Sequence, residues 1–342
     1  MSFFIGIEGG ATKSSGVLVD GKNGEILKEI TGGPANVRTE DLSTVISRLE
    51  KIMKFLYMSS SSDVPITGKV SLGLTLAGAS QEDIQAKIAV EIKQRVKFID
   101  RIIINTDAVA PVFMSQKKGT VLICGTGSSC LFVTEDGIQK RSGGLGHMLG
   151  IGDEGSAFWI ATKAIKSVLD KADGIPNNVL DTTLIEAEIK SYFKIEDLKE
   201  LIKIYQENFD KGKIAGFTAK LAAIAKEKDD PVAKICFASA GGELAKLVVS
   251  MEDTLEIGEE EPPEILCQGS VWNSWELLKE SFIQGMKLHS KLTALSLVRV
   301  SVSCAYGAAR FASIKLTDAP LDSKLTFNLI ETVQIQRESP VL

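Results

Sequence analysis

Two glycine-rich turns are the segments of this sequence whose residue types most directly suggest chemistry. Gly9-Gly10-Ala11-Thr12 and Gly125-Thr126-Gly127-Ser128 each separate two short runs of β-prone residues. Glycine permits positive φ values and lets successive backbone N–H groups approach an anion, while a Thr or Ser hydroxyl adds another donor. Taken singly, either turn is more often an ordinary hairpin than a ligand site. Their equivalent places in two similar halves of the chain favour a clamp on the phosphates of a nucleotide.

Neither turn follows the better known nucleotide-binding patterns. The Walker A pattern Gly-x-x-x-x-Gly-Lys-Ser/Thr is absent, and each turn joins two strands, whereas a dinucleotide fingerprint opens a helix. The phosphate hypothesis therefore depends on the pairing of the two turns.

Asp107 is the candidate for proton transfer. It follows the apolar run Ile102–Asn105, which reads as a buried strand, and open α/β sheets bind ligands at the carboxyl ends of their strands. A carboxylate at that place can take the proton of a sugar hydroxyl that attacks a phosphorus atom. By position alone, capping of the next segment explains Asp107 equally well.

The segment Gly143–Ser156 is the most glycine-dense part of the chain. Such backbone freedom suits a loop that wraps a small ligand, with Asp153 accepting hydrogen bonds from sugar hydroxyls. Alternatively, Asp153 or Glu154 caps the helix that begins near Ser156.

Other residues near these segments receive simpler interpretations. Gly216 and the turn Gly269-Ser270 can let the backbone pass close to a nucleoside. Both histidines, His147 and His289, and two of the three tryptophans, Trp272 and Trp275, are expected to be structural, without a role in the chemistry.

Two copies of one βββαβαβ plan position these residues. Each copy begins with a strand, a glycine turn and a strand, and continues with helices that cross between strands, as in α/β packing. In the first copy, strands are expected at 3–8, 15–19, 25–30, 70–76 and 101–105, with helices at 42–58 and after the capping-box pattern Ser80–Asp83. In the second copy, strands are expected at 120–124, 130–133, 138–140, 264–268 and 297–300, with helices at 274–288 and 306–314. Helices are also expected at 161–169, 184–193, 198–208, 213–226 and 232–250.

This pattern predicts an α/β protein of two RNase H-like βββαβαβ lobes with a central cleft. The N-terminal lobe is expected at 1–117 and the C-terminal lobe at 118–315, with a helical insertion in the second lobe at about 154–251. Residues 316–342 are expected to form a C-terminal tail that packs back on the N-terminal lobe.

Composition limits the classes of function. A chain of 342 residues, 44% of them hydrophobic, is long enough for two domains, and its net charge of −5 gives no basic footprint for nucleic acid. The odd number of cysteines, 5, favours a reducing compartment over a disulfide scaffold. Met1–Glu8 lacks the basic start of a secretory signal, and no apolar run approaches the roughly 20 residues of a membrane span. We therefore expect a cytoplasmic protein that binds neither nucleic acid nor membranes.

Six segments, in chain order, resemble the eukaryotic N-acetylglucosamine kinases. They are Glu8–Lys13, Asn105–Ala108, Gly125–Ser128, Gly143–Met148, Gly152–Ile160 and Gly269–Lys279. The wider group is the actin/Hsp70/sugar-kinase superfamily, in the branch shared with the BadF/BadG-type ATPases that activate dehydratases. The resemblance runs from residue 3 to about residue 315, and the Gly-Asp-Glu-Gly-Ser and Gly-Ser-Val-Trp-x-Ser-Trp segments are its specific parts.

The resemblance implies an actin-like ATPase fold that holds ATP and an amino sugar. The implied reaction transfers the γ-phosphoryl group to the 6-hydroxyl of N-acetyl-D-glucosamine, with Asp107 as general base. Mg²⁺ is expected on the nucleotide, largely through water, with no metal ligand assigned to the protein, and a homodimer is expected. The implied sugar-site residues are Asn36, Asp107, Ser128, Ser129, Gly144, Leu145, Gly146 and Asp153. The implied nucleotide-site residues are Gly10, Thr12, Lys13, Gly125, Thr126, Gly127, Gly216, Gly269 and Ser270.

Departures from the family pattern all fall in the sugar site. Leu145 stands where the relatives carry Trp, Ser142 replaces a Cys, and Ser129 replaces an Asn. Gly150-Ile151 resembles a two-residue insertion before Asp153. The preferred sugar is therefore left open, whereas ATP is the firmer expectation.

Other functions remain open at this point. The chain could phosphorylate another hexose or N-acetylhexosamine, or be a non-catalytic relative that binds a nucleotide or sugar. A third alternative is an ATPase that activates an iron–sulfur dehydratase. Such ATPases carry cysteines placed to bridge a cluster across a dimer, but Cys124 and Cys130 flank the second glycine turn on strands and no such pair stands out.

Overall fold

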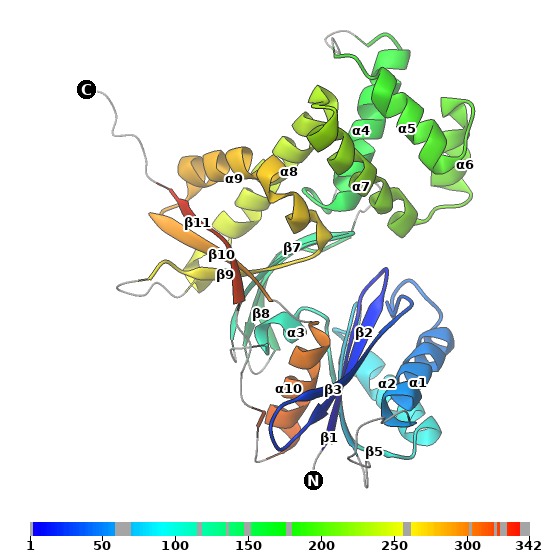
Figure 1. Cartoon of the computed structure of the whole chain (residues 1–342), viewed down its shortest axis with the longest axis vertical. Helices are drawn as coiled ribbons and strands as arrows, with labels where there is room; N and C mark the ends of the chain where they lie inside the picture. The colour runs from blue at the N-terminus through cyan, green and yellow to red at the C-terminus, as the bar shows by residue number, and fades with distance from the viewer. Residues whose placement is uncertain are drawn as a thin grey trace. The chain divides into compact units, whose positions relative to one another are not determined.

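Two β-sheets with helices packed against them form the framework of the chain (Figure 1). The computed structural model describes residues 3–58, 70–114, 118–134, 137–146, 152–175, 180–255, 261–300, 303–317, 320–321 and 327–335. The first of two compact units comprises Met1–Val121, Phe132–Lys140 and Val298–Ile330. The second comprises Leu122–Leu131, Arg141–Leu297 and Glu331–Leu342, so the chain passes between the units five times.

The sheet of the first unit has the strand order β3-β2-β1-β4-β5. Its strands are β1 (Phe3–Gly9), β2 (Ser14–Asp20), β3 (Ile26–Gly32), β4 (Val70–Leu76) and β5 (Ile99–Asn105). Short turns make β1, β2 and β3 antiparallel, whereas helical crossovers make β1, β4 and β5 parallel. The carboxyl ends of β1, β4 and β5 therefore share one edge of the sheet.

Helices cover both faces of this first sheet. Figure 1 shows α1 (Leu42–Met58) and α2 (Glu82–Arg95) on one side and α10 (Ala305–Leu316) on the other. The apolar face of α1 packs on the sheet through its buried residues Val45, Ile46, Leu49, Ile52, Met53 and Leu56. The short α3 (Val109–Val112) packs against α10. Two apolar cores thus hold the sheet between helical layers.

Glycines let α10 lie directly on the sheet backbone. A Cβ atom at Gly6 of β1 would overlap the Ala305 carbonyl, and one at Gly73 of β4 would overlap the Ala308 carbonyl. These obstacles are backbone atoms of α10, which cannot move aside as a flexible side chain can. Glycine is therefore required at these two positions if α10 is to cover the first sheet.

The second sheet has the strand order β11-β10-β9-β6-β7-β8. Its strands are β6 (Gly119–Cys124), β7 (Ser128–Thr134), β8 (Gly137–Gly143), β9 (Glu264–Gln268), β10 (Ala294–Val300) and β11 (Phe327–Gln334). This order repeats that of the first sheet, with β11 added at the edge beside β10. The twofold βββαβαβ plan predicted from the sequence is therefore confirmed for the order of the strands.

A group of helices lies between β8 and β9 in the sequence. They are α4 (Ala157–Ala172), α5 (Thr183–Phe193), α6 (Leu201–Gln206), α7 (Lys211–Glu227) and α8 (Pro231–Val249), with short 3₁₀ turns η2 (Leu198–Glu200) and η3 (Glu252–Thr254). After β9, η4 (Ser270–Ser274) leads into α9 (Trp275–His289). The close packing of α8 on α9 needs Gly241, where a Cβ atom would overlap the Leu278 carbonyl.

Several details differ from the sequence predictions. The capping box at Ser80–Asp83 is wrong, because α2 has Gln81 as its N-cap and no side chain caps it. The helix expected at 198–208 is divided into η2 and α6 and ends at Gln206. The unexpected strand β11 comes from the segment that was assigned to a C-terminal tail, and α10 belongs to the first unit.

Candidate active site

Two acidic residues, Glu8 and Asp107, lie at the carboxyl ends of strands β1 and β5 of the first sheet. Glu8 on β1 lies opposite Thr75 on β4, which lies opposite Asn105 on β5. Asp107 follows two residues after Asn105, at the edge where parallel α/β sheets bind ligands. Glu8 and Asp107 are both half-buried. The fold thus brings together Asp107, which the sequence singled out, and Glu8, to which it gave no role.

The environment of these two carboxylates disfavours negative charge. Burial, and after it the charge of Asp107, raises the pKa of Glu8 to about 7, although Lys13 opposes the rise. Burial also raises the pKa of Asp107, while hydrogen bonds from the Thr106 hydroxyl, 3.0 Å from Oδ1, and from backbone N–H groups lower it in part. A carboxylate whose pKa is raised accepts a proton more readily near neutral pH, as a general base must.

The first glycine turn lies beside these acids. The Gly10 N–H donates to the Lys13 carbonyl at 2.8 Å, and the Gly10 carbonyl accepts the Ala35 N–H at 3.0 Å. The second bond holds the segment of Asn36 next to the turn. Thr12 and Lys13 are exposed, so their side chains are accessible to a ligand. The first unit therefore gathers the predicted residues Gly10, Thr12, Lys13, Asn36 and Asp107.

Asn36 also has a structural task. Its side-chain oxygen accepts the Arg38 N–H at 3.0 Å and lies against Gly78, which has a φ of 85°. The Val37 N–H donates to the Ala77 carbonyl at 3.0 Å, which fixes the segment to the turn after β4. Its side-chain amide nitrogen can still donate to a bound hydroxyl.

Asp153 supports the second glycine turn through a hydrogen bond to its backbone. The turn closes through the Gly125 N–H, which donates to the Gly127 carbonyl at 2.9 Å. Asp153 Oδ1 accepts the Ser128 N–H at 3.3 Å, and a Cβ atom at Gly127 would lie only 2.8 Å from it. Asp153 has a left-handed φ of 59°, and its side chain is buried. The predicted sugar ligand Asp153 is therefore also a support of the predicted phosphate turn.

Lys211 pairs with this buried carboxylate. Its Nζ lies 2.5 Å from Asp153 Oδ2 and 5.8 Å from the centre of the Phe158 ring. Lys211 opens α7, where the helix dipole disfavours a positive charge, so a nearby anion stabilises it. The sequence reasoning missed Lys211; its unfavourable place at a helix start is the signal that could have found it.

The remaining predicted sugar-site residues divide into two groups. Gly144 donates its N–H to the Ser128 carbonyl at 3.1 Å, and its α-carbon lies against the Ser129 side chain, so these three residues are adjacent. The Ser128 hydroxyl donates its proton to the Glu154 carbonyl at 2.6 Å. The Ser128 hydroxyl oxygen can therefore only accept a hydrogen bond from a ligand. Leu145, by contrast, is 66% exposed, and a Cβ atom at the neighbouring Gly146 would meet no other atom.

A cavity of about 400 Å³ adjoins the second turn. Gly216 of α7 and Ser270 of η4, the two residues expected near the nucleoside, both line it. Gly269 has a φ of 111° and packs on the Cys124–Gly125 backbone, where a Cβ atom would overlap it. Ala157, which also lines the cavity, donates its N–H to the Gly125 carbonyl at 2.9 Å, so the second unit places the predicted nucleoside residues near the predicted phosphate turn.

Several further predictions concern the tryptophans, the cysteines, metal sites and membrane spans. Trp272 and Trp275 are buried, which confirms that they are core residues. All 5 cysteines are free thiols. His147 and the segment Gly150-Ile151 lie outside the described residues. Within the described ranges, no group of three His, Cys, Asp or Glu side chains could hold a metal ion. No helix in the part of the chain that the structure describes is long and apolar enough to cross a membrane.

Comparison with known proteins gives a consistent set of matches. Residues 5–312 match the BadF/BadG/BcrA/BcrD ATPase family. The N-acetylmuramic acid/N-acetylglucosamine kinase of Clostridium acetobutylicum is 26% identical over 316 residues, which cover 91% of this chain and 98% of that protein. The N-acetyl-D-glucosamine kinase of Dictyostelium discoideum is 30% identical over 195 residues, which cover 54% of this chain and 59% of that protein.

A solved structure supports the same fold. A protein of Chromobacterium violaceum, described as an N-acetylglucosamine kinase, superposes with a TM-score of 0.68 at 18% identity. The match covers 91% of this chain and 99% of that protein. The α/β fold expected from the sequence, with its likeness to the actin-like sugar kinases, is thereby confirmed.

Proposed function

Because this chain belongs to the BadF/BadG/BcrA/BcrD ATPase family, we propose that it is an ATP-dependent sugar kinase whose acceptor is an amino sugar. N-acetyl-D-glucosamine is the proposed acceptor, and N-acetyl-D-glucosamine 6-phosphate and ADP are the products. The observation that carries this proposal is Asp107, a half-buried carboxylate with a raised pKa at the carboxyl end of β5. The two curated kinases named above support the choice of an N-acetylated sugar.

Asp107 acts as the general base in the proposed reaction. It accepts the proton of the sugar 6-hydroxyl while that oxygen forms a bond to the γ-phosphorus. The bond from the γ-phosphorus to the bridging oxygen breaks, and its electron pair stays on ADP. Because burial raises its pKa, the Asp107 carboxylate accepts a proton near neutral pH more readily than an exposed Asp would.

The glycine turns bind the phosphates in this mechanism. Backbone N–H groups near Gly10 and Gly125 donate to phosphate oxygens, and the hydroxyls of Thr12 and Thr126 add donors. Asp153 holds the second turn in shape through the Ser128 N–H, so that its donors are positioned before the nucleotide arrives. Gly216 and Ser270 border the cavity proposed for the nucleoside.

The Glu8 carboxylate, which lies near Asp107, also fits a magnesium ion bound with ATP. Burial raises the pKa of Glu8 and the charge of Asp107 adds to the rise, so a cation beside Glu8 would favour its ionised form while Asp107 acts as the base. Oxygen ligands of this kind suit Mg²⁺, held directly or through water. When bound, Mg²⁺ neutralises charge on the nucleotide phosphates.

A coupled ADP-release assay over a sugar panel tests the function. The panel contains N-acetylglucosamine, N-acetylmuramic acid, N-acetylmannosamine and glucose, because the departures at Leu145 and Ser129 from the family pattern leave the preferred sugar open. Asp107→Asn should lower kcat by about 10²- to 10⁴-fold, as expected for loss of a general base. Asp100→Asn, at the exposed opposite end of β5, is the matched control and should retain activity.

The outcomes separate the competing functions. If no sugar raises ADP release but ADP still binds, the chain is a non-catalytic nucleotide-binding relative. If Asp107→Asn retains full kcat, Asp107 is not the base. A homodimer and a cytoplasmic location complete the proposal, the latter supported by the free thiols. Light scattering and cell fractionation test them.

A further inference from the structure

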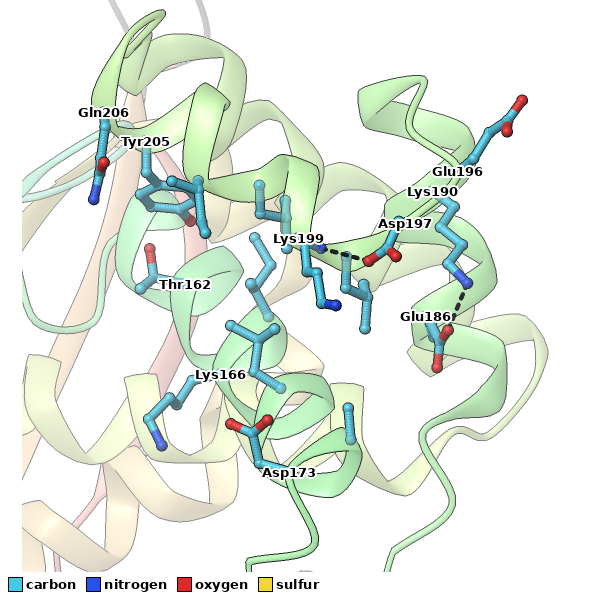
Figure 2. Close-up of a pocket in the computed structure, with 16 residues that line it drawn as sticks. Thr162, Lys166, Asp173, Glu186, Lys190, Glu196, Asp197, Lys199, Tyr205 and Gln206 are labelled. Carbon is cyan, nitrogen blue, oxygen red and sulfur yellow. Dashed lines mark hydrogen bonds and ion pairs between the residues drawn. The ribbon is translucent and has the colours of Figure 1, made fainter.

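A hollow of about 710 Å³ lies among α4, α5, η2 and α6, and Figure 2 shows the side chains that line it. Its walls are largely apolar, with Ile165 and Leu169 on α4 and Ile202 on α6. Nothing in the described part of the second unit shows what occupies it, so we assign it no ligand. The contacts around Asn36 in the first unit, by contrast, point to a specific role for a residue of α1.

The segment 33–40, between β3 and α1, carries Asn36, which is proposed to contact the sugar. Two backbone hydrogen bonds fasten its middle to the first glycine turn and to the turn after β4. At its start, the Gly33 carbonyl accepts the buried Ser14 hydroxyl at 2.8 Å. At its end, the Glu40 N–H donates to the Asn36 carbonyl at 3.1 Å. The position of Asn36 therefore depends on how both ends of the segment are held.

Arg48 of α1 contacts both ends of this segment. Its Nη1 donates to the Pro34 carbonyl at 2.6 Å and forms an ion pair with Glu40 Oε2. A Cβ atom at Gly33 would lie 3.6 Å from Arg48 Nε, so the guanidinium also packs on the backbone there. Because Nη1 carries two N–H groups, it can serve both acceptors at once. Arg48 therefore bridges the residues on either side of Asn36.

Both acceptors depend on this guanidinium. Proline has no backbone N–H, so the carbonyl is the one backbone group of Pro34 that can be hydrogen-bonded. The Glu40 side chain is 21% exposed, and its Oε1 is buried without a hydrogen-bond partner among the described residues. Loss of the Arg48 cation would leave this carboxylate partly buried and unpaired, which is costly. Glu40 would then turn toward water, and its N–H would leave the Asn36 carbonyl.

We propose that Arg48 is a positioning residue of the acceptor site, which holds the segment 33–40 so that the Asn36 amide stays beside the first glycine turn and can bind the sugar. Arg48 acts through this segment and not by touching the sugar. The inference rests on the proposed function, in which Asn36 contacts the acceptor. The first glycine turn has its own closing bond, from the Gly10 N–H to the Lys13 carbonyl at 2.8 Å, so loss of Arg48 should affect the sugar more than ATP.

Hydrogen exchange of the full chain without ligands tests the positioning directly. Arg48→Met keeps an unbranched side chain but removes its charge and its donors. Exchange at the Val37 and Glu40 N–H groups should become faster by about tenfold or more. Lys54→Met is the matched control, because it breaks the 2.7 Å ion pair with Glu50 on the same helix and should leave this exchange unchanged. Unchanged exchange in Arg48→Met would overturn the proposal.

Steady-state kinetics of the proposed kinase reaction test the consequence for sugar binding. Arg48→Met should raise the KM for the sugar by about fivefold to thirtyfold, while kcat at saturating sugar and the KM for ATP stay within about twofold. A purely structural role would instead lower the fraction of active protein, and so kcat, without changing either KM. Equal changes in the two KM values, or a loss confined to kcat, would contradict the proposal.

A double variant tests the part played by the stranded charge. Adding Glu40→Met to Arg48→Met removes the unpaired carboxylate and should bring the KM for the sugar back to within about threefold of the unaltered chain. If Arg48→Met does not fold, Arg48→Lys, which keeps the charge, should show the same changes to a smaller degree. If the unaltered chain phosphorylates no sugar, the kinase proposal fails, whereas the exchange measurement still decides whether Arg48 holds the segment. A double variant no better than Arg48→Met would overturn the role given to Glu40.

Discussion

The ion pair of Lys211 and Asp153 leads to an asymmetric prediction. The Asp153 side chain is 3% exposed, whereas the Lys211 side chain is 26% exposed. Lys211→Met removes the ammonium and leaves a buried carboxylate whose described hydrogen-bond donor is the Ser128 N–H at 3.3 Å. Asp153→Asn leaves an ammonium that can turn toward water. The two substitutions break one contact but leave very different groups behind.

The expected magnitudes follow from that difference. Removing one partner of a fully buried pair costs about 3–5 kcal/mol, because the other charge stays buried and uncompensated. Since Lys211 is partly exposed, we expect about 2–4 kcal/mol for Lys211→Met. Asn tolerates the left-handed φ at position 153 and keeps an acceptor for the Ser128 N–H, so Asp153→Asn should cost about 1 kcal/mol.

Tryptophan fluorescence during urea unfolding measures these losses in the right place. All three tryptophans, Trp159, Trp272 and Trp275, lie in the second unit together with the ion pair. Lys213→Met, at an exposed position of the same helix, is the matched control and should change the free energy of unfolding by less than about 0.5 kcal/mol. An equal loss for both substitutions, or a larger loss for Asp153→Asn, would refute the reasoning.

Three other predictions concern single side chains. The pKa of Glu8 is raised from 4.5 to about 7 in the folded chain, so the fold favours the protonated carboxyl group, and the free energy of unfolding without Mg²⁺ should fall by roughly 2–3 kcal/mol as pH rises from 4.5 to 7. Glu8→Gln should flatten this pH profile in urea unfolding followed by circular dichroism. An unchanged profile would contradict the prediction. Gly73→Ala should cost about 3 kcal/mol or more in thermal unfolding, because its Cβ atom overlaps the backbone of α10, whereas Gly242→Ala meets nothing and should be neutral or stabilising. Glu331→Ala should speed hydrogen exchange in β11, because it removes hydrogen bonds at 2.7 and 2.8 Å from two side chains of α9; unchanged exchange would show that β11 is held without them.

The sequence was informative where local pattern decides structure. Alternating strand residues and turn glycines predicted the order of the strands, because each hairpin needs only its own residues. The same pattern placed Asp107 at a strand end, and the fold confirms that position. Helix α1 was predicted from Leu42 to Met58 because its apolar face is regular and long.

The sequence could not predict the features that depend on contacts between residues far apart in the chain. Lys211 and Asp153 are separated by 58 positions, so nothing local announces their pairing. The pKa of Glu8 is raised by its burial in the fold and, after that, by Asp107, which the pairing of β1, β4 and β5 brings near it. The capping-box pattern at Ser80 failed because the helix starts one residue later, with Gln81 as N-cap. Strand β11 has no regular alternation of apolar and polar residues, and it forms beside β10, which is distant in the sequence.

The docking of α10 on the first sheet has a consequence for how the chain folds as it is made. The main part of the first unit ends at Val121, but α10, which covers one face of its sheet, ends at Leu316. A ribosome that adds 5–20 residues per second needs about 10–40 s to make the residues between them. During that time the face of the sheet that carries Gly6 and Gly73 lacks its helix, so we expect the nascent first unit to bind chaperones until α10 emerges.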